Sequence, residues 1–238
     1  IILGGIMNNK SLIKKVKNLP VPILPTMVGA FTLSNVYSGM GYTWIRHITA
    51  WAAIAVILSY ILKICFHFDT VKKEYSNTIP ASLYAGFTML TMILGSYFYN
   101  ASPVFGKTLW FVGLILHAIQ ILVFTYNNVI KNFNMQTFVP SWFVTYNGIM
   151  VSTVVGGVMN EPLIGKIVVY YGIAVFTVII PFMIYRLAKH EIKDPVYHTQ
   201  AILLAPSSLC LVSYLNFIST PNKFIIYYLY CAVICALI

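Results

Sequence analysis

The sequence predicts an all-α polytopic membrane protein built from repeated helix hairpins. Charged residues make up only 8% of the 238 residues, whereas a soluble domain carries about 25%. Apolar residues make up 59%, and the mean hydropathy is +0.82. Prolines also recur at intervals of about 60 residues along the apolar segments. A chain so poor in charge cannot cover a water-facing surface, which excludes a soluble domain, a disordered chain and a coiled coil.

Eight apolar segments are expected to span the membrane. A spanning helix needs about 20 mostly apolar residues, and a kinked one can be shorter. The segments are Pro22–Val36, Trp44–Cys65, Pro80–Phe98, Leu109–Ile130, Ser141–Val158, Ile167–Tyr185, Thr199–Phe217 and Phe224–Ile238. We therefore expect a basic N-terminal tail over residues 1–19 and a transmembrane domain over residues 20–238. The chain ends inside an apolar run without flanking charge, so we expect it to be truncated before a last hairpin.

The distribution of basic residues predicts the orientation. Eleven of the fifteen Lys and Arg residues fall in the tail and on the loops of the same side. Such an excess is typical of the cytoplasmic side, so we expect a cytoplasmic N-terminus in an inner or plasma membrane. The net charge of +10 then reflects topology. Because the basic residues form no patch with interleaved aromatics, no nucleic-acid partner is expected.

The prolines define a repeat. Pro22, Pro80 and Pro140 begin the first, third and fifth segments, and Pro195 or Pro206 begins the seventh. The even-numbered helices are expected to lack such a leading proline. One unit is thus a hairpin of about 60 residues, and the chain holds four, which we expect to stack around an axis.

The odd and even helices differ in composition. The even helices are apolar all round, as lipid-facing helices are. The odd helices carry small and polar residues at steps of three and four, which places them on one face. Examples are Tyr84, Thr88, Thr91 and Gly95 in the third helix and Thr145, Gly148, Ser152 and Gly156 in the fifth. Two interpretations stay open: tight helix packing, and a narrow, weakly polar conduit lined by the odd helices.

The absence of buried carboxylates restricts the transported species. All five Asp and Glu residues fall outside the predicted spans. A proton-coupled pump or a cation channel is expected to place a carboxylate in its pathway. Hydroxyl and backbone N–H groups, with positive charge at one mouth, suit an anion that binds weakly enough to leave.

The sequence carries no catalytic or metal-binding motif. His117 lies within the fourth span and His47 near the start of the second, and two membrane histidines raise the alternative of haem ligation. The other interpretation is a hydrogen-bonded structural histidine and an interfacial one. The four cysteines have no metal-ligand spacing. We therefore expect no enzyme activity, no cofactor and no metal.

The order of these features resembles the tellurite-resistance/dicarboxylate transporter family, whose members include bacterial TehA and the plant slow-type anion channels. The resemblance runs from about Pro20 to the chain end. It is carried by PTMVGAFTLSNVY, TIPASLYAGFTML, VPSWFVTYNGIMV and LLAPSSLCLVSYL. It implies five hairpins around a quasi-fivefold axis, with odd helices lining a central pore, even helices in an outer ring, and a homotrimer. The family's gating phenylalanine lies on a ninth helix, beyond this chain.

The expected function is an anion channel or transporter that passes small anions or dicarboxylates. One alternative is a secondary carrier that exports malate-like dicarboxylates or tellurite. Another is a membrane haem protein or enzyme that uses His47 and His117, and a third is a purely structural membrane subunit. The candidate pore-lining residues are Gly29, Thr32, Thr88, Thr91, Thr145, Gly148, Ser152, Pro206 and Ser213.

Overall fold

A computed structural model describes residues 14–191 and 194–237, and within these ranges the chain forms helices and no strand. The first half contains α2 (Ile23–Gly39), α3 (Thr43–Phe66), the short α4 (Phe68–Tyr75), α5 (Thr78–Leu83), α6 (Ala85–Tyr99) and α7 (Pro103–Thr125), which continues as the π-helix η1 (Tyr126–Lys131). Residues 1–13 of the predicted basic tail lie outside the described part of the chain, as does Lys193.

The second half begins with the 3-10 turn η2 (Met135–Thr137) and a broken helix. The broken helix consists of α8 (Trp142–Tyr146), η3 (Gly148–Met150), α9 (Val151–Val155) and η4 (Gly156–Met159). There follow α10 (Pro162–Lys189), η5 (Asp194–Leu203), α11 (Leu204–Phe217) and α12 (Lys223–Leu237). Each of the eight predicted spans therefore falls on one helix or two consecutive helices, except Ser141–Val158, which falls on the four elements of the broken helix.

Among the described residues, five helical segments are long and apolar enough to cross a membrane: Thr43–Phe66, Thr78–Tyr99, Pro103–Lys131, Pro162–Lys189 and Thr199–Phe217. Two shorter apolar helices, Gly148–Met159 and Lys223–Leu237, accompany them. The protein is thus an all-α polytopic membrane protein, as predicted.

The expectation that only odd helices begin with a proline is wrong. Pro103 occupies the first turn of α7 and Pro162 the first turn of α10, so both even helices start several residues before the predicted spans. Proline suits this position because its missing N–H would have no partner in the first turn, and its φ is already helical. Residues 103–108 and 162–166, which lie outside the predicted spans, are therefore helical.

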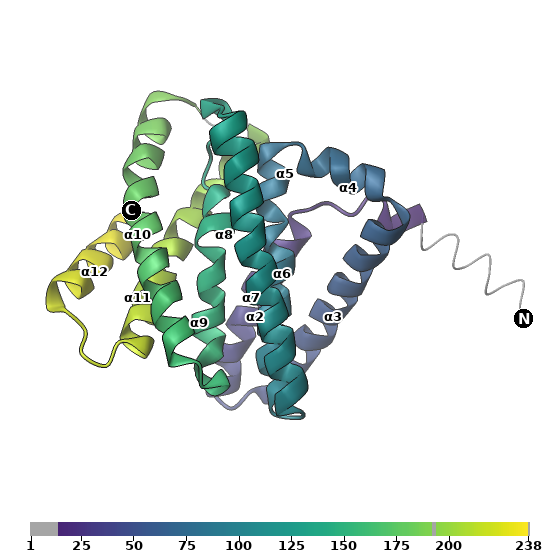
Figure 1. Cartoon of the computed structure of the whole chain (residues 1–238), viewed down its shortest axis with the longest axis vertical. Helices are drawn as coiled ribbons and strands as arrows, with labels where there is room; N and C mark the ends of the chain where they lie inside the picture. Colours follow the sequence, from purple (N-terminus) through teal and green to yellow (C-terminus); the bar gives the residue numbers. More distant parts are fainter. Residues whose placement is uncertain (1–13, 192–193, 238) are drawn as a thin grey trace, which may run out of the picture.

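The helices form an inner row and an outer layer. Along the inner row, α2 packs against α6, α6 against α9, and α9 against α11. On the outer side, α3 packs on α2 and α6, α7 on α6 and α8, α10 on α11, and α12 on α11 (Figure 1). In the most apolar stretch of each segment, 78% of the residues are buried in Thr78–Tyr99, against 22% in α3 and 28% in α10. The apolar faces of the outer helices are therefore left to lipid.

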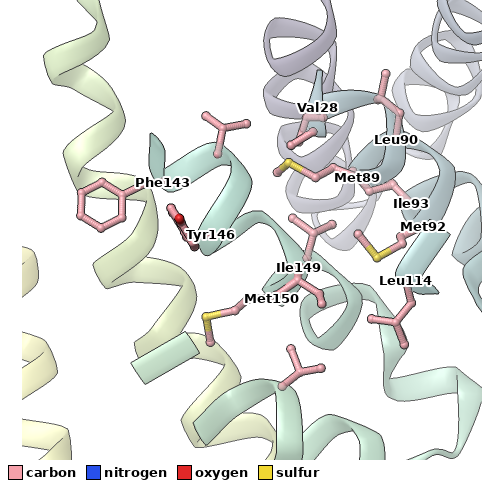
Figure 2. Close-up of a cluster of buried hydrophobic side chains, with 14 of the residues drawn as sticks. Val28, Met89, Leu90, Met92, Ile93, Leu114, Phe143, Tyr146, Ile149 and Met150 are labelled. Carbon is pink, nitrogen blue, oxygen red and sulfur yellow. The ribbon is translucent and has the colours of Figure 1, made fainter. Parts of the chain in front are cut away.

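The core lies where the inner helices meet. Val28 of α2, Met89 and Ile93 of α6, Leu114 of α7 and Ile149 of η3 are all buried in one hydrophobic cluster. Figure 2 shows these side chains converging at the break in the fifth spanning segment.

We use "basic end" for the end of the bundle that holds α4, η1, η2 and the C-terminal end of α10. Figure 1 shows α4 lying crosswise there, at the top of the view, with the short turns after α2, α6 and η4 at the opposite end. Asp69 in the first turn of α4 and Lys72 and Lys73 in its last turn match the helix dipole.

Candidate functional site

The two candidate residues of α2, Gly29 and Thr32, are less buried than the other candidates. A Cβ added at Gly29 would meet no atom within 4 Å. Thr32 is half-buried, and its hydroxyl donates to the carbonyl of Val28, 2.8 Å away on the same helix. Gly29 therefore faces away from the neighbouring helices, whereas Thr32 is only partly uncovered.

Three other candidates come together around His117 of α7. The His117 ring is fully buried, with Nδ1 2.7 Å from the Thr88 hydroxyl and Nε2 2.8 Å from the carbonyl oxygen of Thr145. Because a carbonyl only accepts, Nε2 carries the proton, and in the neutral ring Nδ1 can only accept. The single proton of the Thr88 hydroxyl is then shared between Nδ1 and the carbonyl of Ala85, which lies 2.9 Å from the same oxygen. Gly148 completes the group, since a Cβ there would lie 2.9 Å from the ring. A pore-lining role for these three residues stays a prediction.

The remaining candidates lie deeper in the inner row. Thr91 is buried and its hydroxyl donates to the carbonyl of Phe87, 2.9 Å away. Ser213 of α11 is 2.6 Å from the hydroxyl of Thr153 on α9. Pro206 is buried in the first turn of α11. The Ser152 hydroxyl is buried and has no hydrogen-bond partner within the described residues, which makes it an unsatisfied polar group inside the row.

Asn147 is a residue that the sequence analysis did not single out. It follows α8 at the break, and its Nδ2 donates to the carbonyl of Gly172 on α10, 3.0 Å away. The same Nδ2 lies 3.7 Å from the sulfur of Cys210 on α11. Its side chain therefore joins the break to α10 and α11, while its buried Oδ1 has no hydrogen-bond partner within the described residues. Its position one residue before Gly148 of the predicted stripe is the signal that could have revealed it.

The histidines do not fit a haem site. Both ring nitrogens of His117 are taken by Thr88 and Thr145. His47 is exposed at the opposite end from the basic end, and its Nδ1 lies 2.7 Å from the Tyr97 hydroxyl. His117 thus connects α7 to α6 and α8, which is the role of a structural histidine.

We expect His117→Leu to lower the free energy of unfolding by about 2 kcal/mol, because it leaves the buried Thr145 carbonyl without its donor. SDS titration of the purified protein, followed by circular dichroism, measures this. His47→Leu is the control and should change stability by about 0.5 kcal/mol or less, since its bond is exposed. Equal losses in both variants would contradict the structural role of His117.

Comparison with known proteins identifies the family. The sequence profile described as "Voltage-dependent anion channel" matches residues 19–238. The chain belongs to this family. The tellurite resistance protein TehA homolog of Haemophilus influenzae is 22% identical over 170 residues, a match that covers 68% of this chain and 50% of that relative. The chain thus spans about half the length of the relative. Membership supports a membrane anion channel or transporter, and the resemblance found in the sequence is confirmed.

Proposed function

We propose that this voltage-dependent anion channel family member forms the wall of a conduit for small anions along its inner row. The observation that carries the proposal is the composition of that row. The segments α2, α5–α6, α8–η4 and α11 contain no Asp, Glu, Lys, Arg or His. A path along these helices offers hydroxyls, glycine backbone and aromatic edges, and it presents no carboxylate that would repel an anion.

The positive charge at the basic end also supports anion passage. Lys72, Lys73 and Lys131 are exposed at the basic end, while the inner row itself is free of fixed charge. Positive charge at a mouth raises the local anion concentration without adding a tight binding site in the path. The excess of basic residues supports placing this end in the cytoplasm of a plasma or inner membrane. A homotrimer, with one conduit in each subunit, belongs to the same proposal and rests on the family resemblance.

We expect Gly29→Phe to reduce anion flux at least about tenfold, because a Cβ at this position meets open space and the ring would enter the proposed path. Flux is measured as chloride or nitrate efflux from liposomes that contain the intact protein. Gly29 is a sharper target than the buried Thr91 or Ser152, where a phenylalanine would also disturb packing.

Two controls accompany this variant. Gly39→Phe tests a second position on α2 at which a Cβ meets open space, and Val112→Phe tests a lipid-exposed position on α7. Both should leave flux near the wild-type value. Equal loss in all three variants would contradict the assignment of Gly29 to the conduit.

The form of the flux separates a channel from a carrier. A channel gives a reversal potential near the anion equilibrium value in planar bilayers. A secondary carrier for malate-like dicarboxylates or tellurite gives saturable, coupled uptake instead and would replace the channel proposal. Well-folded protein that passes neither class of substrate would favour a structural subunit.

A further inference from the structure

A hollow of about 540 Å³ opens at the basic end between two elements that are far apart in sequence. One wall comes from α4 and the turn that follows it. The other wall comes from η1, the π-helical turn that extends α7, and from Asn132 directly after it. The hollow touches the inner row only at Thr78, the first residue of α5, and Gly29 is not among its lining residues. Its lysines belong to the positive end of the proposed conduit, but no part of the proposed path runs through it.

Two cations face this hollow without a partner. Lys72 from α4 and Lys131 from η1 both line it, and both are exposed. Neither has an ion pair or a hydrogen bond to its ammonium group within the described residues. Glu74, the carboxylate nearest to Lys72 along the chain, is bonded to the buried Lys63. The hollow therefore keeps two uncompensated positive charges.

Neutral polar groups complete the same wall. Asn127, Asn128 and Asn132 line the hollow, together with Ser76 and Thr78. The Thr78 hydroxyl donates to Oδ1 of Asn128, 2.7 Å away, which fixes this part of the wall across two spanning segments. The side chains of Asn127 and Asn132 are exposed and free to donate.

Helix dipoles alone do not explain this arrangement. Each lysine lies in the last turn of its helix, where a cation is favourable. The interaction with the helix dipole does not require the two lysines to face the same hollow. The π-helical turn is a rare geometry that often marks functional sites, and it brings Asn127, Asn128 and Lys131 to the same hollow as Lys72. The convergence of donors from two elements indicates a binding site for an anion.

The remaining wall is apolar and lies at the level where the spanning helices end. Phe68, Val71 and Tyr75 of α4 line it, and Phe68 is 62% exposed. Burial raises the pKa of the Tyr75 hydroxyl, so this group adds no negative charge at neutral pH. The two spanning helices α3 and α7 end beside the hollow, at Phe66 and Thr125. The site thus combines a cationic wall with an apolar wall at the membrane boundary.

We propose that this hollow binds the phosphate group of an anionic phospholipid between Lys72 and Lys131, with the asparagine amides donating to its oxygens and the apolar face of α4 against its glycerol and acyl region. A free phosphate would use only the polar wall, whereas a lipid occupies both. The apolar face of α4, the amphipathic helix beside the membrane, favours the lipid.

The test is native mass spectrometry of the intact protein in detergent, titrated with phosphatidylglycerol or with phosphatidylcholine of the same acyl chains. We expect the protein to prefer phosphatidylglycerol, and K72Q/K131Q to weaken its binding about tenfold. The matched control is K73Q/K189Q, which removes two exposed lysines from the same end outside the hollow. It should retain the preference.

Equal binding of phosphatidylglycerol by K72Q/K131Q and the wild type would overturn the proposal. Release of the bound lipid by millimolar inorganic phosphate, with no preference between the two lipids, would overturn the lipid as the source and assign the site to free phosphate. Thermal unfolding of both double variants in detergent is measured in parallel. The ammonium groups of the four lysines have no hydrogen bond or ion pair within the described residues. We therefore expect both double variants to unfold at the same midpoint temperature as the wild type.

Discussion

Replacing Lys63 with methionine is expected to lower the free energy of unfolding by about 3 kcal/mol, the largest loss we expect from removing one charge. Lys63 lies near the end of α3, and its side chain is completely buried. Its ammonium group lies 2.8 Å from each carboxylate oxygen of Glu74 and 2.8 Å from the carbonyl of Leu19. All three of its protons are therefore used, and methionine removes this donor from the Leu19 carbonyl and from both carboxylate oxygens of Glu74.

The contacts around this pair extend the effect beyond one interaction. Glu74 also accepts from the hydroxyl of Tyr84, at the junction of α5 and α6. The Tyr60 hydroxyl donates to the carbonyl of Pro20, one residue after Leu19. The pair therefore joins α3, α4 and the third spanning segment to the residues that lead into α2. Its loss should loosen the whole first hairpin at the basic end.

Lys107 provides a matched control. Its ammonium group lies 2.6 Å from Glu161, but both side chains are about one-third exposed. An exposed ion pair of this kind contributes about 0.2–1 kcal/mol, so Lys107→Met should have a small effect. SDS titration compares the two variants. The double variant K63M/E74M should recover most of the loss, because a buried pair can be replaced by apolar side chains of similar volume. A loss in Lys63→Met no greater than in Lys107→Met would contradict the role of the buried pair.

The positions of the helices were predictable because each spanning segment is an apolar run with a local boundary signal. The first, third and fifth segments begin within two residues of the prolines that the sequence analysis singled out. The starts of α7 and α10 were missed because residues 99–108 and 159–166 are less apolar than the runs that follow them. Pro103 and Pro162 were the available signals.

The stripe of small and polar residues in the third segment could be predicted from the sequence, but the helix against which it packs could not. Thr88 contacts His117 of α7, and Gly95 lies against Gly106 and Trp110 of the same helix. Spacing by three and four residues defines a face of a helix, yet an inner helix has one face toward the path and others toward its neighbours. The partner of a face is a long-range property, so hydropathy patterns along one segment could not supply it. Glycine packing against α7 explains this part of the stripe.

The second large effect that we expect follows from that packing: Gly106→Ala should destabilise the protein by about 2–3 kcal/mol. A Cβ on Gly106 would lie 2.5 Å from the backbone N and Cα of Tyr99 and 2.6 Å from the carbonyl oxygen of Gly95. These are backbone atoms of α6, which cannot rotate away as a flexible side chain does. The two helices would have to move apart along the closest stretch of their contact.

Gly95→Ala tests the same contact from the other helix. Its Cβ would lie 2.6 Å from the backbone N of Trp110 and 2.8 Å from the carbonyl oxygen of Gly106. Because small residues let helix backbones approach in a membrane, where no hydrophobic effect drives helices together, losing the close approach removes much of what holds α7 on α6. We expect a loss comparable to that of Gly106→Ala, measured by SDS titration.

Gly29→Ala is the control that separates packing from helix propensity. Its Cβ meets open space, and alanine is favoured over glycine within a helix by about 1 kcal/mol. We therefore expect Gly29→Ala to be neutral or slightly stabilising. The double variant G95A/G106A should lose less than the sum of the two single variants, because the helices separate only once. Additive losses, or a loss in Gly29→Ala as large as in Gly106→Ala, would show that close approach of α6 and α7 is not what these glycines provide.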